Sequence, residues 1–202
     1  MQKIILVIAI ILIGLLNFSC KKEVKKAKPI TTYSLVEKTT VINWTAYKTT
    51  EKKPVKGKFN TIKITGNTSA SSPMDAINNV EFNIPVNSID TKNKDRDSKL
   101  LTSFFGSMKN TTELTGKVNL NNDGKGTINL KMNGISKDFP INYIISGQVV
   151  EINAIINLDN WQAKIAIDAL NLACKELHKG ADGVSKTWNE VNLNIVTYLK
   201  VE

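Results

Sequence analysis

The sequence predicts a mainly β protein in which antiparallel strands curl into a barrel. Three observations support this prediction. Apolar and polar residues alternate with period two through most of the chain, short turn sequences separate the alternating runs, and only one long segment has helical periodicity. A strand that alternates in this way has one face in the core and one in water, as in an antiparallel sheet covered on one side.

About eight alternating runs are present, at residues 40–48, 57–65, 80–86, 113–120, 127–132, 139–145, 150–156 and 191–195. Turn sequences rich in Gly, Asn, Asp and Ser lie between several of them, at 121–126, 133–137 and 146–148. Eight strands can close into a barrel, which removes exposed edges and leaves room for packed side chains or one small ligand. A β-sandwich has the same periodicity, so the pattern alone leaves that alternative open.

One segment has helical rather than strand periodicity. Its apolar positions follow the spacing i, i+4, i+7 and i+11 and are Ala166, Leu170, Ala173 and Leu177. This spacing predicts an amphipathic helix over about 160–179. We expect Asp159 or Asn160 to cap its start and Gly180 to end it.

Residues 1–19 predict a lipoprotein signal peptide. The apolar run Ile4–Leu16 is shorter than the roughly 20 residues of a membrane-spanning helix, and it leads to Cys20, where a lipobox places the cysteine that is lipidated. Residues 20–30 are rich in lysine and predict a tether, and residues 31–202 predict a single domain. We therefore expect an exported, membrane-anchored lipoprotein. Lys21 favours the outer membrane, with a periplasmic or a surface orientation left open.

Composition argues against nucleic-acid binding and against catalysis. The formal net charge is +9, which in an exported protein points to lipid headgroups or acidic polysaccharide. The only histidine is His178, and it pairs only with Cys174, at i, i+4. Two ligands are too few for a closed zinc site. We expect no enzyme, no metal and no cofactor apart from a bound lipid, with Cys174 in the core and the cationic form of His178 favoured by a helix C-terminus.

The segment 90–108 begins with a dense run of charges and ends in an aromatic pair. A catalytic carboxylate pair is one interpretation, but the sequence supplies no nucleophile or metal set beside it. The alternative is a short helical lid over about 97–108. In that interpretation Arg96 and Asp97 hold the loop in one shape. The residues expected to cover an apolar opening are Phe104, Phe105 and Met108.

Several short motifs lie in and around this segment, namely Ser88-Ile89-Asp90-Thr91, Arg96-Asp97, Lys99-Leu100, Phe104-Phe105, Gly57-Lys58-Phe59 and Gly134-Ile135-Ser136-Lys137. In these motifs the chain resembles the YceI-like family of exported bacterial proteins. Lys99 and Asn133 stand where the family usually has histidine. The resemblance covers roughly residues 31–200, and the segment 178–191 is similar to lipoproteins of Bacteroidetes-type bacteria. It implies a lipocalin-like barrel that accommodates a polyisoprenoid, an isoprenoid quinone or a fatty acyl chain.

These observations together predict binding or carriage of a long amphiphilic lipid inside the barrel, without covalent chemistry. The alternative is a structural or interaction lipoprotein with a filled barrel, and a homodimer is left open. The residues expected to line the cavity are Trp44, Phe59, Phe82, Ile84, Met132, Tyr143 and Ile152.

Overall fold

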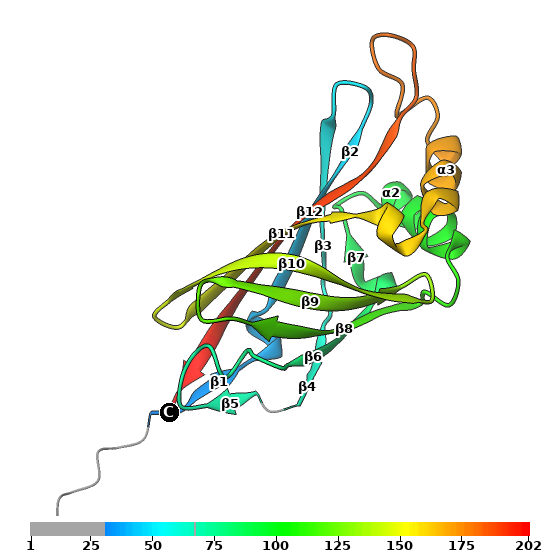
Figure 1. Ribbon diagram of the computed structural model, residues 1–202. Coiled ribbons are helices and arrows are strands. Elements are labelled where there is room, and N and C mark those ends of the chain that lie inside the picture. Colours follow the sequence, from blue (N-terminus) through cyan, green and yellow to red (C-terminus); the bar gives the residue numbers. More distant parts are fainter. Residues whose placement is uncertain (1–30, 67) are drawn as a thin grey trace, which may run out of the picture. The chain divides into compact units, whose positions relative to one another are not determined.

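A computed structural model describes residues 31–66 and 68–202. The predicted signal peptide, Cys20 and the tether lie outside the described residues. Twelve strands of the described chain form one antiparallel sheet (Figure 1). They are β1 Tyr33–Leu35, β2 Val41–Lys48, β3 Lys53–Phe59, β4 Lys63–Thr65, β5 Ser69–Ala70, β6 Glu81–Pro85, β7 Ile89–Asp90, β8 Glu113–Leu120, β9 Lys125–Met132, β10 Ile135–Ser146, β11 Val149–Asn157 and β12 Thr187–Val201.

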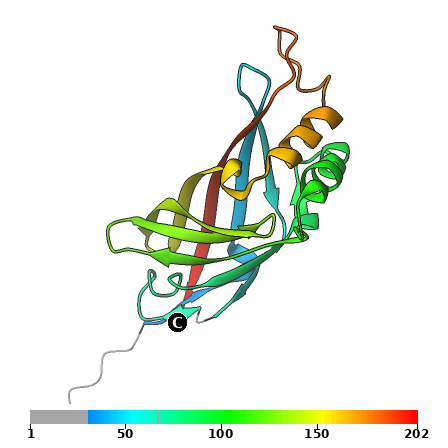
Figure 2. The same cartoon turned by 45° about the vertical axis from the view of Figure 1, so that its right-hand side comes forward.

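Short helices connect the strands, and those that follow β7 and β11 gather at one end of the sheet, whereas the one that precedes β2 contacts Tyr198 near the other end (Figure 1). Within residues 31–66 and 68–202, none is long and apolar enough to cross a bilayer. They are η1 Glu37–Thr39, η2 Val86–Ser88, α2 Lys94–Lys99, the π-helical η3 Leu100–Phe104, η4 Phe105–Ser107, η5 Leu158–Trp161 and α3 Lys164–Ala173. Both α2 and α3 lie at the same end of the sheet in two views (Figures 1 and 2).

The sheet curls and is closed by one bent segment, residues 81–90. Its first half, β6, pairs with β8, and its second half, β7, pairs with β3 on the other side. Pro85 ends the first ladder because proline has no backbone N–H to donate, and η2 then turns the chain. Counting β6 and β7 as one bent strand gives the predicted circuit of eight, namely β2, β3, β6–β7, β8, β9, β10, β11 and β12. The β-sandwich alternative is wrong, because one hydrogen-bonded sheet contains all these strands.

The β9–β10 hairpin shows how local sequence sets the register. Asn133 and Gly134 both have positive φ, at 52° and 72°, as a two-residue type I′ turn requires. Met132 and Ile135 are the first pair of the ladder that follows. This register turns one side of each strand inward, so that Ile128 and Ile141 are 3% and 2% exposed.

Trp161 of η5 packs against strands β9 and β10. Its side chain is completely buried, and its Nε1 donates to the Leu130 carbonyl at 2.9 Å. Its ring meets Phe139 edge-on, with the centroids 6.1 Å apart. The Asn133 side chain donates to the Trp161 carbonyl at 2.8 Å, which ties the β9–β10 turn to η5.

The predicted amphipathic helix is present but shorter than expected. Gln162 adopts a left-handed conformation with φ of 53°, which separates η5 from α3. The start of α3 at Ala163 has no side-chain cap, so the predicted capping by Asp159 or Asn160 is wrong. The helix ends at Ala173, before Gly180, and turns occupy the chain from Cys174 onward.

Candidate functional site

An apolar cavity of about 140 Å³ lies inside the curled sheet. Thr187, Trp44 and Trp188 are the only lining residues whose side chains contain an oxygen or a nitrogen atom. The lining residues are Ile42, Trp44, Ala46, Phe59, Phe82, Ile84, Ile89, Leu100, Phe104, Phe105, Leu114, Ile128, Leu130, Met132, Phe139, Ile156, Leu158, Leu170, Thr187, Trp188, Val191, Leu193 and Ile195. A concave, mostly apolar site with few polar groups is typical of a small-molecule pocket.

Trp44 forms one wall of the cavity because the residue opposite it on β3 has no side chain. Trp44 and Gly57 are register partners, and a Cβ on Gly57 would lie 2.6 Å from Trp44 Cε2 and 2.9 Å from Cη2. The indole therefore lies over the bare backbone of β3. Its Nε1 is buried without a hydrogen-bond partner in the described chain, and a buried unmet donor costs about 1–3 kcal/mol.

A helical lid covers one end of the cavity, which we call the mouth, bounded by Leu100, Phe104, Leu170, Thr187 and Trp188. The lid consists of α2, η3 and η4. It starts earlier than predicted because the Asn93 side chain caps α2 by accepting from the Arg96 backbone N–H at 2.9 Å. The outer cover of the lid is α3, which packs against η3 and η4.

Asp97 fixes the charged loop that leads into the lid. Its carboxylate is 6% exposed, and Oδ1 accepts from the Thr91 backbone N–H at 2.8 Å and the Thr91 hydroxyl at 2.7 Å. Asp90 adds a second turn by accepting from the Lys92 backbone N–H at 2.9 Å. The charges in this loop thus serve to hold backbone, which matches the interpretation as a lid.

The sequence matches the family model of the YceI-like domain over residues 33–198. The chain belongs to the YceI-like family. No curated protein matches the chain.

Solved structures have the same fold as this YceI-like domain at low sequence identity. A polyisoprenoid binding domain from Saccharophagus degradans, implicated in plant cell wall breakdown, is 14% identical with a TM-score of 0.60, over 84% of this chain and 98% of that one. BcnA of Burkholderia cenocepacia is 12% identical with a TM-score of 0.51, over 80% and 96%. The YCEI protein of Campylobacter jejuni is 20% identical with a TM-score of 0.52, over 74% and 86%. These similarities confirm the predicted fold.

The structure places most of the predicted lining residues of this YceI-like domain around the cavity. Five of the seven lie in its wall, namely Trp44, Phe59, Phe82, Ile84 and Met132. Tyr143 and Ile152 are buried, at 8% and 5% exposure, but lie outside the lining. The Tyr143 hydroxyl donates to the Asn121 carbonyl in the β8–β9 turn. Alternation identifies the inward face of a strand but not the depth along the barrel, which explains these two positions.

Some of the predicted lid residues line the cavity and others do not. Phe104 and Phe105 line the cavity, and Phe105 packs edge-on against Phe104 and Phe59, with centroid separations of 5.0 and 6.5 Å. Met108 is 8% exposed and belongs to the core outside the lining. The Arg96 backbone takes part in the α2 cap, whereas its guanidinium forms no ion pair within the described residues.

Thr187, Trp188 and Leu170 are among the lining residues that the sequence pattern did not predict. Thr187 and Trp188 belong to β12, which begins before the predicted strand at 191–195. A register shift between Thr187 and Val191 interrupts the alternation there and hides the start of the strand. Leu170 was assigned to the apolar face of a helix, and only the tertiary structure brings that face over the mouth.

Cys174 and His178 lie beside the mouth. Burial raises the pKa of the Cys174 thiol, and His178 Nδ1 lies 2.7 Å from the Thr187 hydroxyl. Burial first, and then the charges of Lys48, Lys99 and Arg96, lower the pKa of His178 to about 4. The predicted stabilisation of its cationic form by a helix C-terminus is wrong, since α3 ends before it. In the part of the chain that the structure describes, no three His, Cys, Asp or Glu side chains are grouped to hold a metal.

Proposed function

We propose that the protein binds and carries a long amphiphilic lipid, with the acyl or isoprenoid chain inside the barrel and no covalent chemistry. The observation that carries this proposal is the cavity wall, in which apolar side chains from the sheet continue into the lid and α3. The family supports it, as does the likeness in fold to a polyisoprenoid binding domain. A polyisoprenoid, an isoprenoid quinone and a fatty acyl chain all fit this chemistry.

The volume of the cavity bears on how such a ligand enters. An engineered apolar cavity of about 150 Å³ holds one benzene, and this cavity has about 140 Å³. A long chain therefore needs additional space. The lid can supply it, because Phe104 and Phe105 line the cavity from short helices rather than from the sheet. In this proposal the two rings rotate outward when the ligand enters.

Mass spectrometry tests for the ligand directly. The protein is purified gently from its native host and compared under native and denaturing conditions, and organic extracts are analysed for lipids. A stoichiometric non-covalent lipid supports carriage and identifies the ligand class. A clean ligand-free mass, with no uptake of offered farnesol or palmitate, overturns it.

A matched pair of variants connects the binding to the cavity. Ala46→Phe adds a ring inside the cavity, whereas Thr45→Phe adds the same ring to the outer face of β2. Losing three methylenes of contact costs about 2.4 kcal/mol at about 0.8 kcal/mol each, or roughly 50-fold in affinity. We expect that loss for Ala46→Phe and no change for Thr45→Phe. Equal affinities in the two variants would place the ligand elsewhere.

The second candidate function is that of an interaction lipoprotein that uses the outside of the helix. Two large apolar side chains of α3, Ile165 and Leu172, are 73% and 76% exposed, which is unusual for apolar residues on one helix face. Substituting both with serine would abolish partner binding under this alternative. Under lipid carriage the same substitutions leave the affinity for the cavity ligand unchanged.

We further propose that residues 1–19 are removed as a signal peptide and that Cys20 is lipidated, which anchors the exported protein to a membrane, with Lys21 favouring the outer one. The apolar run before Cys20 and the lysine-rich segment after it support this proposal. Labelled palmitate should enter the wild type and not the Cys20→Ala variant. Equal labelling of the two would refute the anchor.

A further inference from the structure

Three cationic side chains border the mouth of the cavity. Lys48 ends β2 and is the register partner of the lining residue Thr187. Arg96 and Lys99 lie on α2, and Lys99 directly precedes the lining residue Leu100. All three residues are half-buried. They come from two elements that are distant in sequence and meet at the same end of the barrel.

No acidic partner neutralises these three cations within the described residues. Other lysines of the same region do form ion pairs, such as Lys92 with Asp90 at 2.8 Å and Lys52 with Glu190 at 2.9 Å. The Lys48 ammonium donates to a neutral carbonyl, that of Leu177, at 2.9 Å. A partly buried charge without a counterion is costly to keep, so this cluster would gain from an added anion.

The buried carboxylate of α2, that of Asp97, is held by the loop and not by the cations. Asp97 follows Arg96 in the chain, but its Oδ1 accepts both hydrogen bonds from Thr91, and its Oδ2 has no hydrogen-bond partner in the described chain. Asp97 therefore lowers the local positive potential but forms no ion pair with any of the three cations.

The cations act on the polar end of the cavity. Lys48, Lys99 and Arg96 each lower the pKa of His178 by their charge, after the larger effect of burial. His178 contacts the cavity through the Thr187 hydroxyl, at 2.7 Å. All three cations therefore raise the electrostatic potential near Thr187, the residue at which the apolar wall of the cavity ends.

We propose that Lys48, Arg96 and Lys99 bind the anionic headgroup, a phosphate or a carboxylate, of the lipid whose chain occupies the cavity. This inference rests on the proposed lipid carriage. An apolar cavity alone recognises only the hydrocarbon chain of a lipid. The cations at its mouth would favour lipids with an anionic headgroup over neutral alcohols and quinones. Arginine and lysine are suited to this role because they form charge-assisted hydrogen bonds to phosphate and carboxylate oxygens.

Affinity measurements with matched probes test the headgroup. Calorimetry on the full-length protein compares farnesyl phosphate with farnesol, and palmitate with hexadecanol. A hydrogen bond to a charged group contributes enough for about a tenfold preference for the anion per cation engaged. The Arg96→Gln/Lys99→Gln variant should lose this preference and keep its affinity for farnesol. Lys94→Gln, an exposed lysine of the same helix, should keep the preference.

The only histidine of the chain gives a second readout. In an NMR titration, bound farnesyl phosphate should raise the pKa of His178 from about 4, because the anion offsets the neighbouring cations. Farnesol should leave it near its starting value. A merely structural role of Arg96 and Lys99 would not produce this difference between the two ligands.

The outcomes separate this inference from the proposed function. Equal affinity for farnesol and farnesyl phosphate overturns the headgroup site and leaves lipid carriage intact. Inorganic phosphate that binds as tightly as farnesyl phosphate overturns it as well, since the site would then take a free anion. Failure to bind any of the four amphiphiles overturns both proposals.

Discussion

Substituting Gly57 by alanine tests whether the wall of the cavity depends on a missing side chain. The new Cβ would lie 2.6 Å from Trp44 Cε2, and closer still to Cζ2, whereas ordinary contact begins at 3.4 Å. The indole must therefore move off β3. Trp44 is 7% exposed and lines the cavity, so the open space in front of it is the cavity itself.

The expected cost follows from overpacking. Forcing an extra methyl group into a packed wall destabilises by about 1–3 kcal/mol. For a domain of this size each kcal/mol lowers Tm by about 2–4 °C, so Gly57→Ala should melt roughly 2–12 °C lower. Ligand affinity should fall as well, because the displaced indole occupies ligand space.

Thermal unfolding of a double-mutant cycle identifies the ring as the cause. In a Trp44→Leu background the clash is absent, and Gly57→Ala should be neutral or stabilise by about 0.4–1 kcal/mol through the unfolded chain. If Gly57→Ala is equally destabilising in both backgrounds, the close approach of Trp44 to Gly57 does not explain the glycine.

Three further predictions concern His178, Asp97 and Trp161. Because the pKa of His178 is lowered from 6.5 to about 4, the free energy of unfolding should be highest above pH 6.5 and fall toward pH 4. At 1.36 kcal/mol per pKa unit, discounted for partial exposure, the loss is about 1–2 kcal/mol. Urea unfolding should show this loss in the wild type and not in His178→Gln. Asp97→Ala leaves the buried Thr91 N–H without its acceptor and should cost about 1–3 kcal/mol and speed hydrogen exchange in α2, whereas exposed Asp95→Ala should do neither. Trp161→Phe loses the hydrogen bond to the Leu130 carbonyl and leaves a void, so it should lower the free energy of unfolding by about 2–4 kcal/mol. Trp188→Phe loses an equivalent bond to the Thr49 carbonyl, but Trp188 is half-buried, so this variant should be less destabilised. Equal destabilisation of the two variants would argue against burial as the cause.

The sequence predicted those parts of the fold that depend on local pattern. Alternation located seven of the eight strands of the curled sheet, and the Asn133-Gly134 dipeptide located the β9–β10 hairpin. Both signals act over a few residues, because strand faces repeat every second residue and a type I′ turn needs only two positive φ values. The strand predicted at 57–65 is wrong, because the chain breaks between β3, which ends at Phe59, and β4, which begins at Lys63 and pairs with β6. The lid was predicted from the charged loop and the paired aromatic residues, Phe104 and Phe105.

The remaining features depend on contacts between distant residues. Closure of the sheet depends on the pairing of Lys58 and Phe59 with Asp90 and Ile89 and on the neighbouring bond from the Asn60 N–H to the Ser88 carbonyl, which nothing in the local pattern indicates. The left-handed Gln162 shortens the predicted helix, and no sequence signal marks it. The cationic cluster at the mouth also joins β2 to α2, so it is visible only once the barrel has formed.

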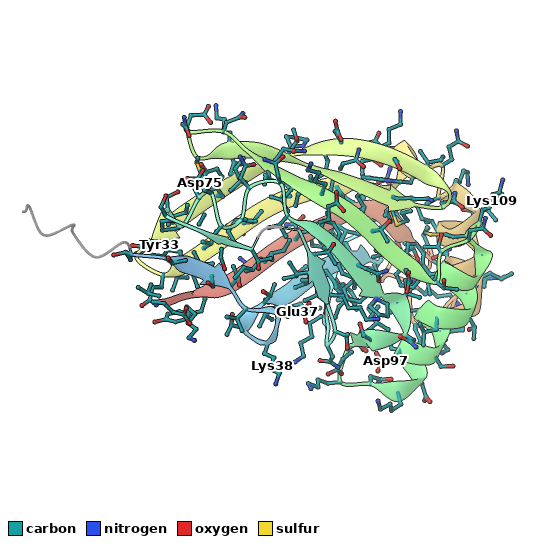
Figure 3. All side chains as sticks on the ribbon, turned by 90° about the horizontal axis from the view of Figure 1, so that it is seen from below. Tyr33, Glu37, Lys38, Asp75, Asp97 and Lys109 are labelled. Atoms are coloured by element: carbon teal, nitrogen blue, oxygen red, sulfur yellow. The ribbon has the colours of Figure 1, made fainter. Side chains whose placement is uncertain are left out.

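The two ends of β12 have different roles in the domain. At one end β1 pairs with Leu199–Val201, and Thr32 donates its N–H to the Glu202 carbonyl. At the other end Thr187 lines the mouth. Tyr33 and Asp97 of the lid accordingly lie on opposite sides of the domain (Figure 3).

The fifteen residues of β12 span about 45–50 Å at 3.3 Å each. Thr187 at the mouth and the pairing of β1 therefore lie at opposite ends of this one strand. A ligand that enters at the mouth enters the domain at the end remote from its first strand.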